Sequence, residues 1–174
     1  ARGFDHALSF SFGGGSHFSD LMGPDVHRPT MLYRKNGELH PELADNFYST
    51  TSFTSELIQG LESTAHTGKP FFAYLALTAP HWPLQLPPDY GDAFSGRYDE
   101  GYDLLRQERL AKQRELGLFD EGQSFAPRPP GVPAWDDLDE ERRQRLSRIM
   151  EIYAGMIQKV DTELDRLLAY LDAK

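Results

Sequence analysis

A continuous run of apolar residues at 71–77 is the strongest feature of the hydrophobic pattern along the chain. The run contains no polar position, as is typical of a strand covered on both faces in a parallel sheet. Pro70 and Pro80 bracket it, which makes it too short for a buried helix. We therefore predict one buried strand at about 70–78, followed by a stiff turn that carries His81 at the edge where open α/β sheets bind ligands.

An amphipathic helix is predicted just before this strand, because apolar residues recur at three- and four-residue spacing from Phe53 to Leu61. Thr51 or Ser52 could cap its start, and Gly68 lies just beyond its end. A helix that leads into a buried strand is an α/β unit, and its sheet needs more strands than this chain supplies. The pattern therefore predicts an α/β fold, mostly helical here, of which the chain holds a part.

Two further helices are predicted in the second half of the chain. Residues 102–118 form the first, and its expected buried face consists of Leu104, Leu105, Leu110 and Leu116. The sequence Asp137-Leu-Asp-Glu140 has the form of a capping box, and it opens a long helix that continues to Leu171. The proline-rich connection 119–135 is predicted to be an extended surface segment. We treat 1–174 as a single piece, because the long helix needs the preceding elements to bury its apolar stripe.

The first 47 residues show little periodicity and are predicted to be mostly ordered loop. One exception is a short exposed hairpin at about 31–40, because the pair Asn36-Gly37 favours the tight turn between two strands. The hairpin would place these two residues at its tip.

Composition excludes several classes of partner and site. The chain has 27 acidic against 18 basic side chains, which argues against a nucleic-acid partner. It has no cysteine, so it holds no disulfide and no thiolate nucleophile. Its longest apolar run falls well short of the roughly 18 residues needed to span a bilayer, so no membrane partner is expected. We expect a soluble protein, cytoplasmic or periplasmic, whose two ends look cut from a longer chain.

Two clusters near the start of the chain carry weak chemical patterns. Gly13-Gly-Gly15 lacks the spacing and the lysine of a phosphate-binding loop, so a flexible turn is the better interpretation. His17 and Asp20 could form half of a metal site, but no neighbouring residue completes it with a known spacing.

The segment from Pro70 to Gln85, Pro-Phe-Phe-Ala-Tyr-Leu-Ala-Leu-Thr-Ala-Pro-His-Trp-Pro-Leu-Gln, resembles the type I sulfatases, and the arylsulfatases in particular, in which a strand ends in an Ala-Pro-His-x-Pro turn. Three more segments are similar to that family and follow in its order: 48–55, 96–109 and 153–161. The resemblance covers nearly the whole chain. It implies a central fragment of the alkaline-phosphatase-like sulfatase fold.

The resemblance implies hydrolysis of sulfate esters by a formylglycine, made from Cys or Ser in a Cys/Ser-x-Pro-x-Arg motif, with a divalent cation that is usually calcium. Neither that motif nor the Lys-x-His motif of the family occurs in this chain. Asp136-Asp137 is the only adjacent aspartate pair, but it opens a polar helix and does not end a strand. We therefore expect no metal ligand and no cofactor in this segment, and no activity from the segment alone.

His81 is the one residue that carries over from the family, where the histidine of this turn contacts the sulfate ester. A donor aimed at the ester oxygens stabilises charge as the S–O bond breaks. Trp82 and Gln85 could shape the wall of the pocket beside it. The expected partners are a small sulfate ester and the rest of the sulfatase chain.

Two alternatives remain open. One is a phosphonate or phosphate ester hydrolase of the same superfamily. The other is a non-catalytic helical module that binds a partner through Met150, Met156 and Ile157. The sulfatase fragment and the helical module are both expected to expose an apolar surface, and the isolated piece could dimerise by covering this surface. The identity of the ester and the precursor of the formylglycine, Cys or Ser, stay open as well.

Overall fold

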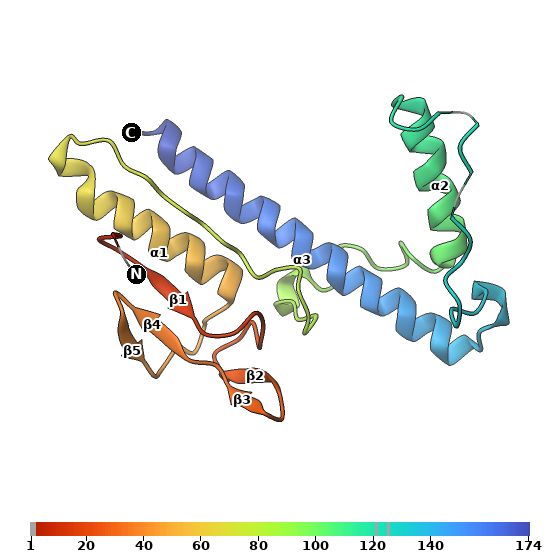
Figure 1. Ribbon diagram of the computed structural model, residues 1–174, viewed down its shortest axis with the longest axis horizontal. Coiled ribbons are helices and arrows are strands. Elements are labelled where there is room, and N and C mark those ends of the chain that lie inside the picture. Colours follow the sequence, from red (N-terminus) through yellow and green to blue (C-terminus); the bar gives the residue numbers. More distant parts are fainter. Residues whose placement is uncertain (1–2, 121, 125) are drawn as a thin grey trace. The chain divides into compact units, whose positions relative to one another are not determined.

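A computed structural model describes residues 3–120, 122–124 and 126–174 (Figure 1). By their internal contacts these residues form two compact units. Unit 1 contains the chain up to Tyr90 together with Gly155–Lys174, and unit 2 contains Gly91–Ala154. The candidate site lies in unit 1.

The strands of unit 1 all lie in the first 40 residues. β1 (Leu8–Phe10), β4 (Tyr33–Lys35) and β5 (Glu38–His40) form an antiparallel sheet in the order β1-β4-β5. β2 (Met22–Asp25) and β3 (Arg28–Thr30) form a separate antiparallel pair. Most of residues 3–47 lie outside strands, as predicted, but β1, β2 and β3 were not anticipated, because strands of three or four residues are too short for an alternating pattern to show.

The hairpin predicted at about 31–40 is confirmed as β4 and β5. Asn36 and Gly37 form its tip and have φ angles of 53° and 91°. Both angles lie in the left-handed region, which the tight hairpin turn requires and which Asn and Gly tolerate best. The hairpin is less exposed than predicted, because Tyr33 is buried where β1 pairs with β4.

Helix α1 (Ser49–Thr64) covers the sheet (Figure 1). It begins three residues earlier than Ser52, and neither Thr51 nor Ser52 caps it; Tyr48 is the N-cap and makes no side-chain hydrogen bond there. A 3-10 turn, η1 (Ala65–Thr67), follows the helix, and Gly68 ends it at a φ of 62°. The buried core beneath α1 consists of Met31, Tyr33, Phe47 and Phe53.

Residues 70–78 do not form the predicted buried strand. The segment is extended and runs beside α1 (Figure 1), but among the described residues it pairs with no strand. Leu75 and Leu77 pack against the core, whereas Phe72 and Tyr74 are 77% and 71% exposed. The segment thus has an extended backbone with one face packed on the core, and the described residues leave the other face exposed.

Unit 2 contains α2 (Gly101–Glu115), a 3-10 turn η3 (Trp135–Asp137) and the first half of α3 (Glu140–Asp172). Of the four leucines predicted on the buried face of α2, Leu110 alone is buried, and Leu116 lies beyond the helix. Gly101 has a φ of 81°, and a Cβ there would lie 2.1 Å from the Trp135 indole. Only glycine therefore permits this packing of the start of α2 against η3.

The start of α3 differs from the predicted capping box. Asp139, and not Asp137, accepts a hydrogen bond from the Arg142 N–H at 2.8 Å, because Asp137 already belongs to η3. The helix runs to Asp172, close to the predicted end.

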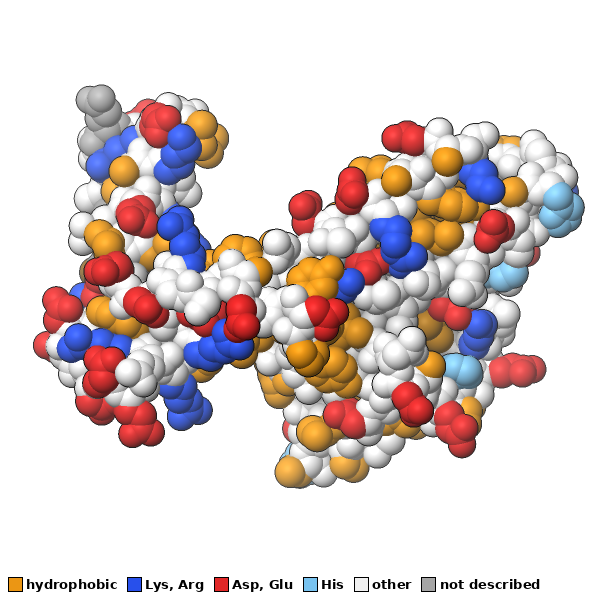
Figure 2. Space-filling model, turned by 180° about the vertical axis from the view of Figure 1, so that it is seen from behind, with side chains coloured by type: hydrophobic (Ala, Val, Ile, Leu, Met, Phe, Trp, Pro, Cys, Tyr) orange, Lys and Arg blue, Asp and Glu red, His pale blue; other side chains and the backbone are white. Residues whose placement is uncertain are grey.

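Another 3-10 turn, η2 (Pro88–Tyr90), ends the first part of unit 1. On the second half of α3, Met156 is fully buried, whereas Leu164 and Leu168 are exposed. Hydrophobic side chains lie open among charged ones on the face of the molecule seen in Figure 2. An exposed apolar surface of this kind was expected from the sequence.

Candidate functional site

The turn after the extended segment holds His81 out to solvent. It is closed by a hydrogen bond from the His81 N–H to the Thr78 carbonyl at 2.9 Å, and the Ala79–Pro80 and Trp82–Pro83 peptide bonds are cis. His81 Nδ1 lies 2.6 Å from the Trp82 carbonyl oxygen. Among the described residues, Nε2 of the same ring has no hydrogen-bond partner. The free nitrogen is therefore the one available to a ligand.

The contact with Trp82 fixes what His81 can donate. A carbonyl oxygen only accepts, so Nδ1 must carry the proton that joins it to the Trp82 carbonyl. In a neutral imidazole Nε2 is then a bare acceptor. His81 donates a hydrogen bond from Nε2 only as the imidazolium cation.

Gly14 lies directly against the His81 ring. A Cβ at position 14 would meet two atoms of the imidazole, Nδ1 and Cε1, at 3.0 Å. A Cβ at Gly13 would meet nothing within 4 Å. Within the run 13–15, Gly14 therefore leaves space for the His81 ring, whereas Gly15 leaves space for the side chain of Met31.

Behind the turn, His17 is buried to 1% exposure and joins three parts of unit 1. Its Nε2 lies 3.0 Å from the His81 carbonyl oxygen, and its Nδ1 lies 2.7 Å from Ser49 Oγ at the start of α1. Thr78 Oγ1 lies 3.3 Å from the same Ser49 hydroxyl. We call His17, Ser49, Thr78 and the His81 carbonyl the His17 cluster.

The hydrogen atoms of this cluster follow from its acceptors. Because the His81 carbonyl can only accept, His17 Nε2 donates to it, and a neutral His17 then accepts at Nδ1 from the Ser49 hydroxyl. Burial lowers the pKa of His17; the hydrogen bond to His81 opposes this, and the charge of His81 adds to it. His17 is thus held neutral, in the tautomer that both contacts need.

Gln85, which the sequence placed beside the pocket, is tied down by the same loop. Its Oε1 accepts from the His17 N–H at 2.7 Å and from the Ser16 hydroxyl at 3.2 Å. The Tyr48 hydroxyl donates to the Gln85 carbonyl at 3.0 Å, and burial raises the pKa of Tyr48 to about 12. Trp82 is 59% exposed, and its ring centre lies 6.1 Å from that of His81. Their contact with substrate stays a prediction.

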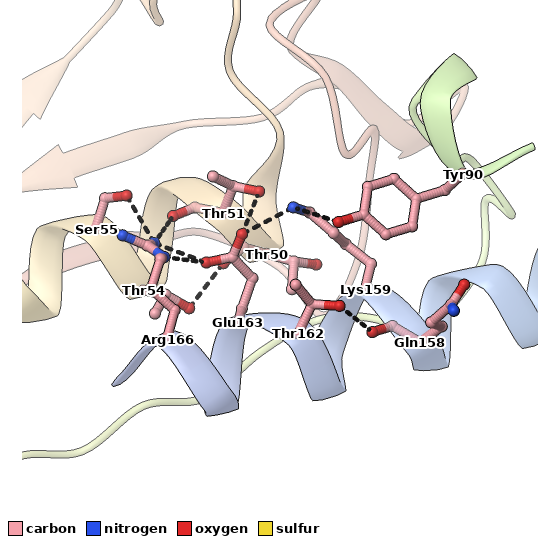
Figure 3. A network of polar contacts seen from close by, with 10 residues as sticks. All are labelled: Thr50, Thr51, Thr54, Ser55, Tyr90, Gln158, Lys159, Thr162, Glu163 and Arg166. Carbon is pink, nitrogen blue, oxygen red and sulfur yellow. Dashed lines mark hydrogen bonds and ion pairs between the residues drawn. The ribbon is translucent and has the colours of Figure 1, made fainter. Parts of the chain in front are cut away.

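A second polar cluster joins α1 to α3 around Glu163, which is 3% exposed (Figure 3). The carboxylate accepts from Thr51 Oγ1 at 2.9 Å, from Lys159 Nζ at 2.8 Å and from Arg166 Nε at 2.7 Å. Burial raises the pKa of Glu163, but these hydrogen bonds outweigh burial and the net direction is downward. We call these four residues the Glu163 cluster.

The described residues do not fit a metal ion or a formylglycine. They contain no group of three or more His, Asp or Glu side chains that could hold a metal. Asp20, the suggested partner of His17, instead accepts a hydrogen bond from the Met22 N–H at 3.0 Å. No helix in the described part of the chain is both long and apolar enough to cross a bilayer.

The sequence analysis predicted His81 as a site residue, but it did not predict the residues that hold the turn of His81 in place. The sequence suggested His17 only as half of a metal site and Gly14 only as part of a flexible glycine turn, and it did not suggest Ser49 as a site residue. Their contacts with the turn and with Gln85 span 29 to 68 residues of sequence, so no local spacing could reveal them.

Comparison with known proteins matches a family model, Sulfatase, over residues 3–174. An uncharacterized sulfatase of Schizosaccharomyces pombe is 39% identical over 176 residues, which is 98% of this chain and 32% of that protein. An arylsulfatase of Klebsiella aerogenes is 33% identical over 171 residues, which is 98% of this chain and 36% of that protein. The chain thus spans about a third of the length of these relatives.

Proposed function

Because the chain belongs to the sulfatase family and is part of an alkaline-phosphatase-like α/β fold, we propose that it is the central part of an enzyme that hydrolyses sulfate esters, aryl sulfates in particular. The name of the Klebsiella aerogenes relative supports the aryl class. The observation that carries the proposal is His81, exposed on its turn with Nε2 free among the described residues.

In this proposal the residues of the chain supply substrate contacts and not the nucleophile. His81, as the imidazolium, donates from Nε2 to an oxygen of the sulfate ester and stabilises the negative charge that grows as the S–O bond breaks. The same proton can pass to the departing aryloxide. The exposed Trp82 indole beside it offers an apolar face for an aryl ring.

The rest of the chemistry is expected outside this segment. The family's divalent cation, calcium in most members, finds no fitting group among the described residues, and the sequence contains no Cys/Ser-x-Pro-x-Arg motif from which a formylglycine could form. The segment alone is therefore expected to show no turnover. We place it as one continuous piece of the catalytic domain.

The remainder of the sulfatase chain is the proposed partner of residues 70–78. Among the described residues the backbone of 70–77 makes no hydrogen bond to other backbone groups. Extended backbone of this kind pairs readily with another strand. Leu164 and Leu168 add exposed apolar surface, which the isolated piece could cover by forming a dimer.

The test is His81→Ala in the complete protein that contains this chain. We expect kcat for an aryl sulfate to fall about a hundredfold or more, the usual scale for the loss of one such group. His27→Ala is the matched control, because His27 is exposed on the β2–β3 turn and bonds Asp25 through its backbone N–H. An unchanged kcat in His81→Ala would contradict the role of His81.

A second measurement separates sulfate from phosphate chemistry. Aryl sulfate and aryl phosphate with the same leaving group are compared by kcat/KM, with release of the phenol as the common readout. A higher value for the sulfate is expected. A higher kcat/KM for the phosphate would favour the alternative, a phosphonate or phosphate ester hydrolase of the same superfamily.

A further inference from the structure

We propose that His17 is a positioning residue for the reaction assigned to His81: it holds the backbone of the turn, and with it the imidazole that meets the ester. The inference rests on the proposed function of His81. It concerns a residue that itself never touches the substrate.

The geometry links His17 to the reactive ring through two carbonyl groups. His17 Nε2 donates to the His81 carbonyl at 3.0 Å, which fixes the peptide unit between His81 and Trp82. The next carbonyl, that of Trp82, accepts from His81 Nδ1 at 2.6 Å and sets the orientation of the ring. A rotation of the first peptide unit therefore moves the ring nitrogen that faces the substrate.

The support for His17 comes from a different element. Ser49 Oγ lies 2.7 Å from Nδ1 and is 2% exposed at the first turn of α1. The Ser49 N–H also donates to the His17 carbonyl at 2.8 Å. Because a helix is more rigid than a loop, these contacts with α1 fix the position of the turn more firmly than contacts with a loop would.

A direct chemical role for His17 does not fit its surroundings. A serine hydroxyl 2.7 Å from an imidazole resembles an activated nucleophile. Both side chains are buried, however, and the other ring nitrogen is committed to a carbonyl. No substrate reaches the pair, so positioning is the function left to it.

The test is a double-mutant cycle in the complete protein, with kcat and KM for an aryl sulfate as readouts. His17→Asn cannot reach the His81 carbonyl, and we expect kcat to fall about tenfold, because small misplacement of a catalytic group costs one to two orders of magnitude. KM should change less than about twofold, since ground-state binding is retained. His17→Gln places an amide N–H near Nε2 and should restore most of the kcat.

The same change in the His81→Ala background is decisive. If His17 acts through His81, His17→Asn should then lower kcat less than about twofold. His6→Asn is the control, because His6 bonds Ser63 on α1 away from the turn. An equal fold loss in both backgrounds would show that His17 only stabilises the fold and would overturn the proposal.

The other outcomes are also distinct. If His81→Ala leaves kcat unchanged, the proposed role of His81 fails, and that of His17 fails with it. If His17→Asn does not yield folded protein, Ser49→Ala completes the same cycle, since it removes the nearer of the two hydroxyls at Nδ1 and keeps the imidazole. A Ser49→Ala loss that persists without the His81 side chain would contradict the proposal equally.

Discussion

The His17 cluster and the Glu163 cluster start from neighbouring residues of the same helix turn, yet they are built from opposite chemistry. Ser49 faces a neutral imidazole and a backbone carbonyl, whereas Thr51 faces a carboxylate flanked by Lys159 and Arg166 (Figure 3). His17, Ser49 and Glu163 are buried, whereas Arg166 at the edge of the second cluster is exposed. The first positions a turn, and the second joins two helices.

The difference shows which kind of hydrogen bond suits the joining of two helices and which suits the support of the His81 turn. Charged hydrogen bonds are stronger than neutral ones, but burying the charges is costly, and they are most useful where two elements must stay together. Neutral hydrogen bonds add no charge beside His81, whose own charge the proposed reaction needs. A charge-free anchor therefore suits the reactive turn. The following predictions test this contrast.

The largest effect is expected at Glu163. Glu163→Ala leaves Lys159, whose side chain is 12% exposed, without its carboxylate, and breaking a buried pair in this way costs about 3 kcal/mol of unfolding free energy or more. Chemical denaturation of the folded protein measures it. Glu62→Ala, at an exposed position of α1, is the control. Equal losses in the two variants would mean that the Glu163 cluster contributes nothing.

A smaller loss is expected at Ser49. Ser49→Ala leaves the buried Nδ1 of His17 with the more distant Thr78 hydroxyl, at 3.4 Å, in place of the Ser49 hydroxyl at 2.7 Å, which costs up to about 2 kcal/mol. Because the cluster is neutral, this loss should not depend on salt, whereas that of Glu163→Ala should shrink as salt is raised. Ser52→Ala on the same helix is the control. A salt-dependent loss at Ser49 would contradict the neutral assignment.

Gly14→Ala should lower kcat of the complete protein about tenfold, equivalent to about 1.4 kcal/mol in the barrier. The added methyl group would meet the His81 ring at 3.0 Å and displace it. Gly13→Ala adds a methyl group into open space and should leave kcat unchanged. The pair therefore isolates the contact with the ring, and identical activity in both variants would rule out a steric role for Gly14.

The smallest effect is a two-step loss of stability on acidification. His17 has a lowered pKa in the folded chain, so its contribution is present above its ordinary value of 6.5 and falls as pH drops below that value. Glu163 also has a lowered pKa, and its contribution falls below about 4.5. Unfolding curves between neutral pH and pH 3 measure both. His17→Gln should remove the upper step alone, and Glu163→Gln the lower step alone.

The periodic parts of the fold could be predicted from the sequence. Helices α1, α2 and α3 were found within a few residues, because repeated apolar positions fix them, and the Asn36-Gly37 turn fixed the hairpin. The short strands β1, β2 and β3 were missed, since they carry no pattern. The strand predicted at 70–78 failed for another reason: an unbroken apolar run indicates burial on both faces, and the described residues cover only one of them.

In the candidate site, too, the sequence predicted the residue that has a local signal and missed the residues that lack one. His81 was found because two prolines and a hydrophobic run mark its turn locally. The contact of His17 with the turn was not predicted, because its burial and its contacts with Ser49 and His81 exist only in the folded chain. Gln85 shows the opposite case: its position suggested the pocket, and its amide oxygen instead secures the loop at Ser16 and His17.

The contact between His17 and the His81 carbonyl has a consequence for protein engineering. Every amino acid carries that carbonyl, so the anchor does not depend on which side chain occupies position 81. A library of replacements at this position, including non-natural imidazole analogues of graded basicity, would be presented on one fixed backbone. Reactivity could then be tuned through the side chain alone, without redesign of its support.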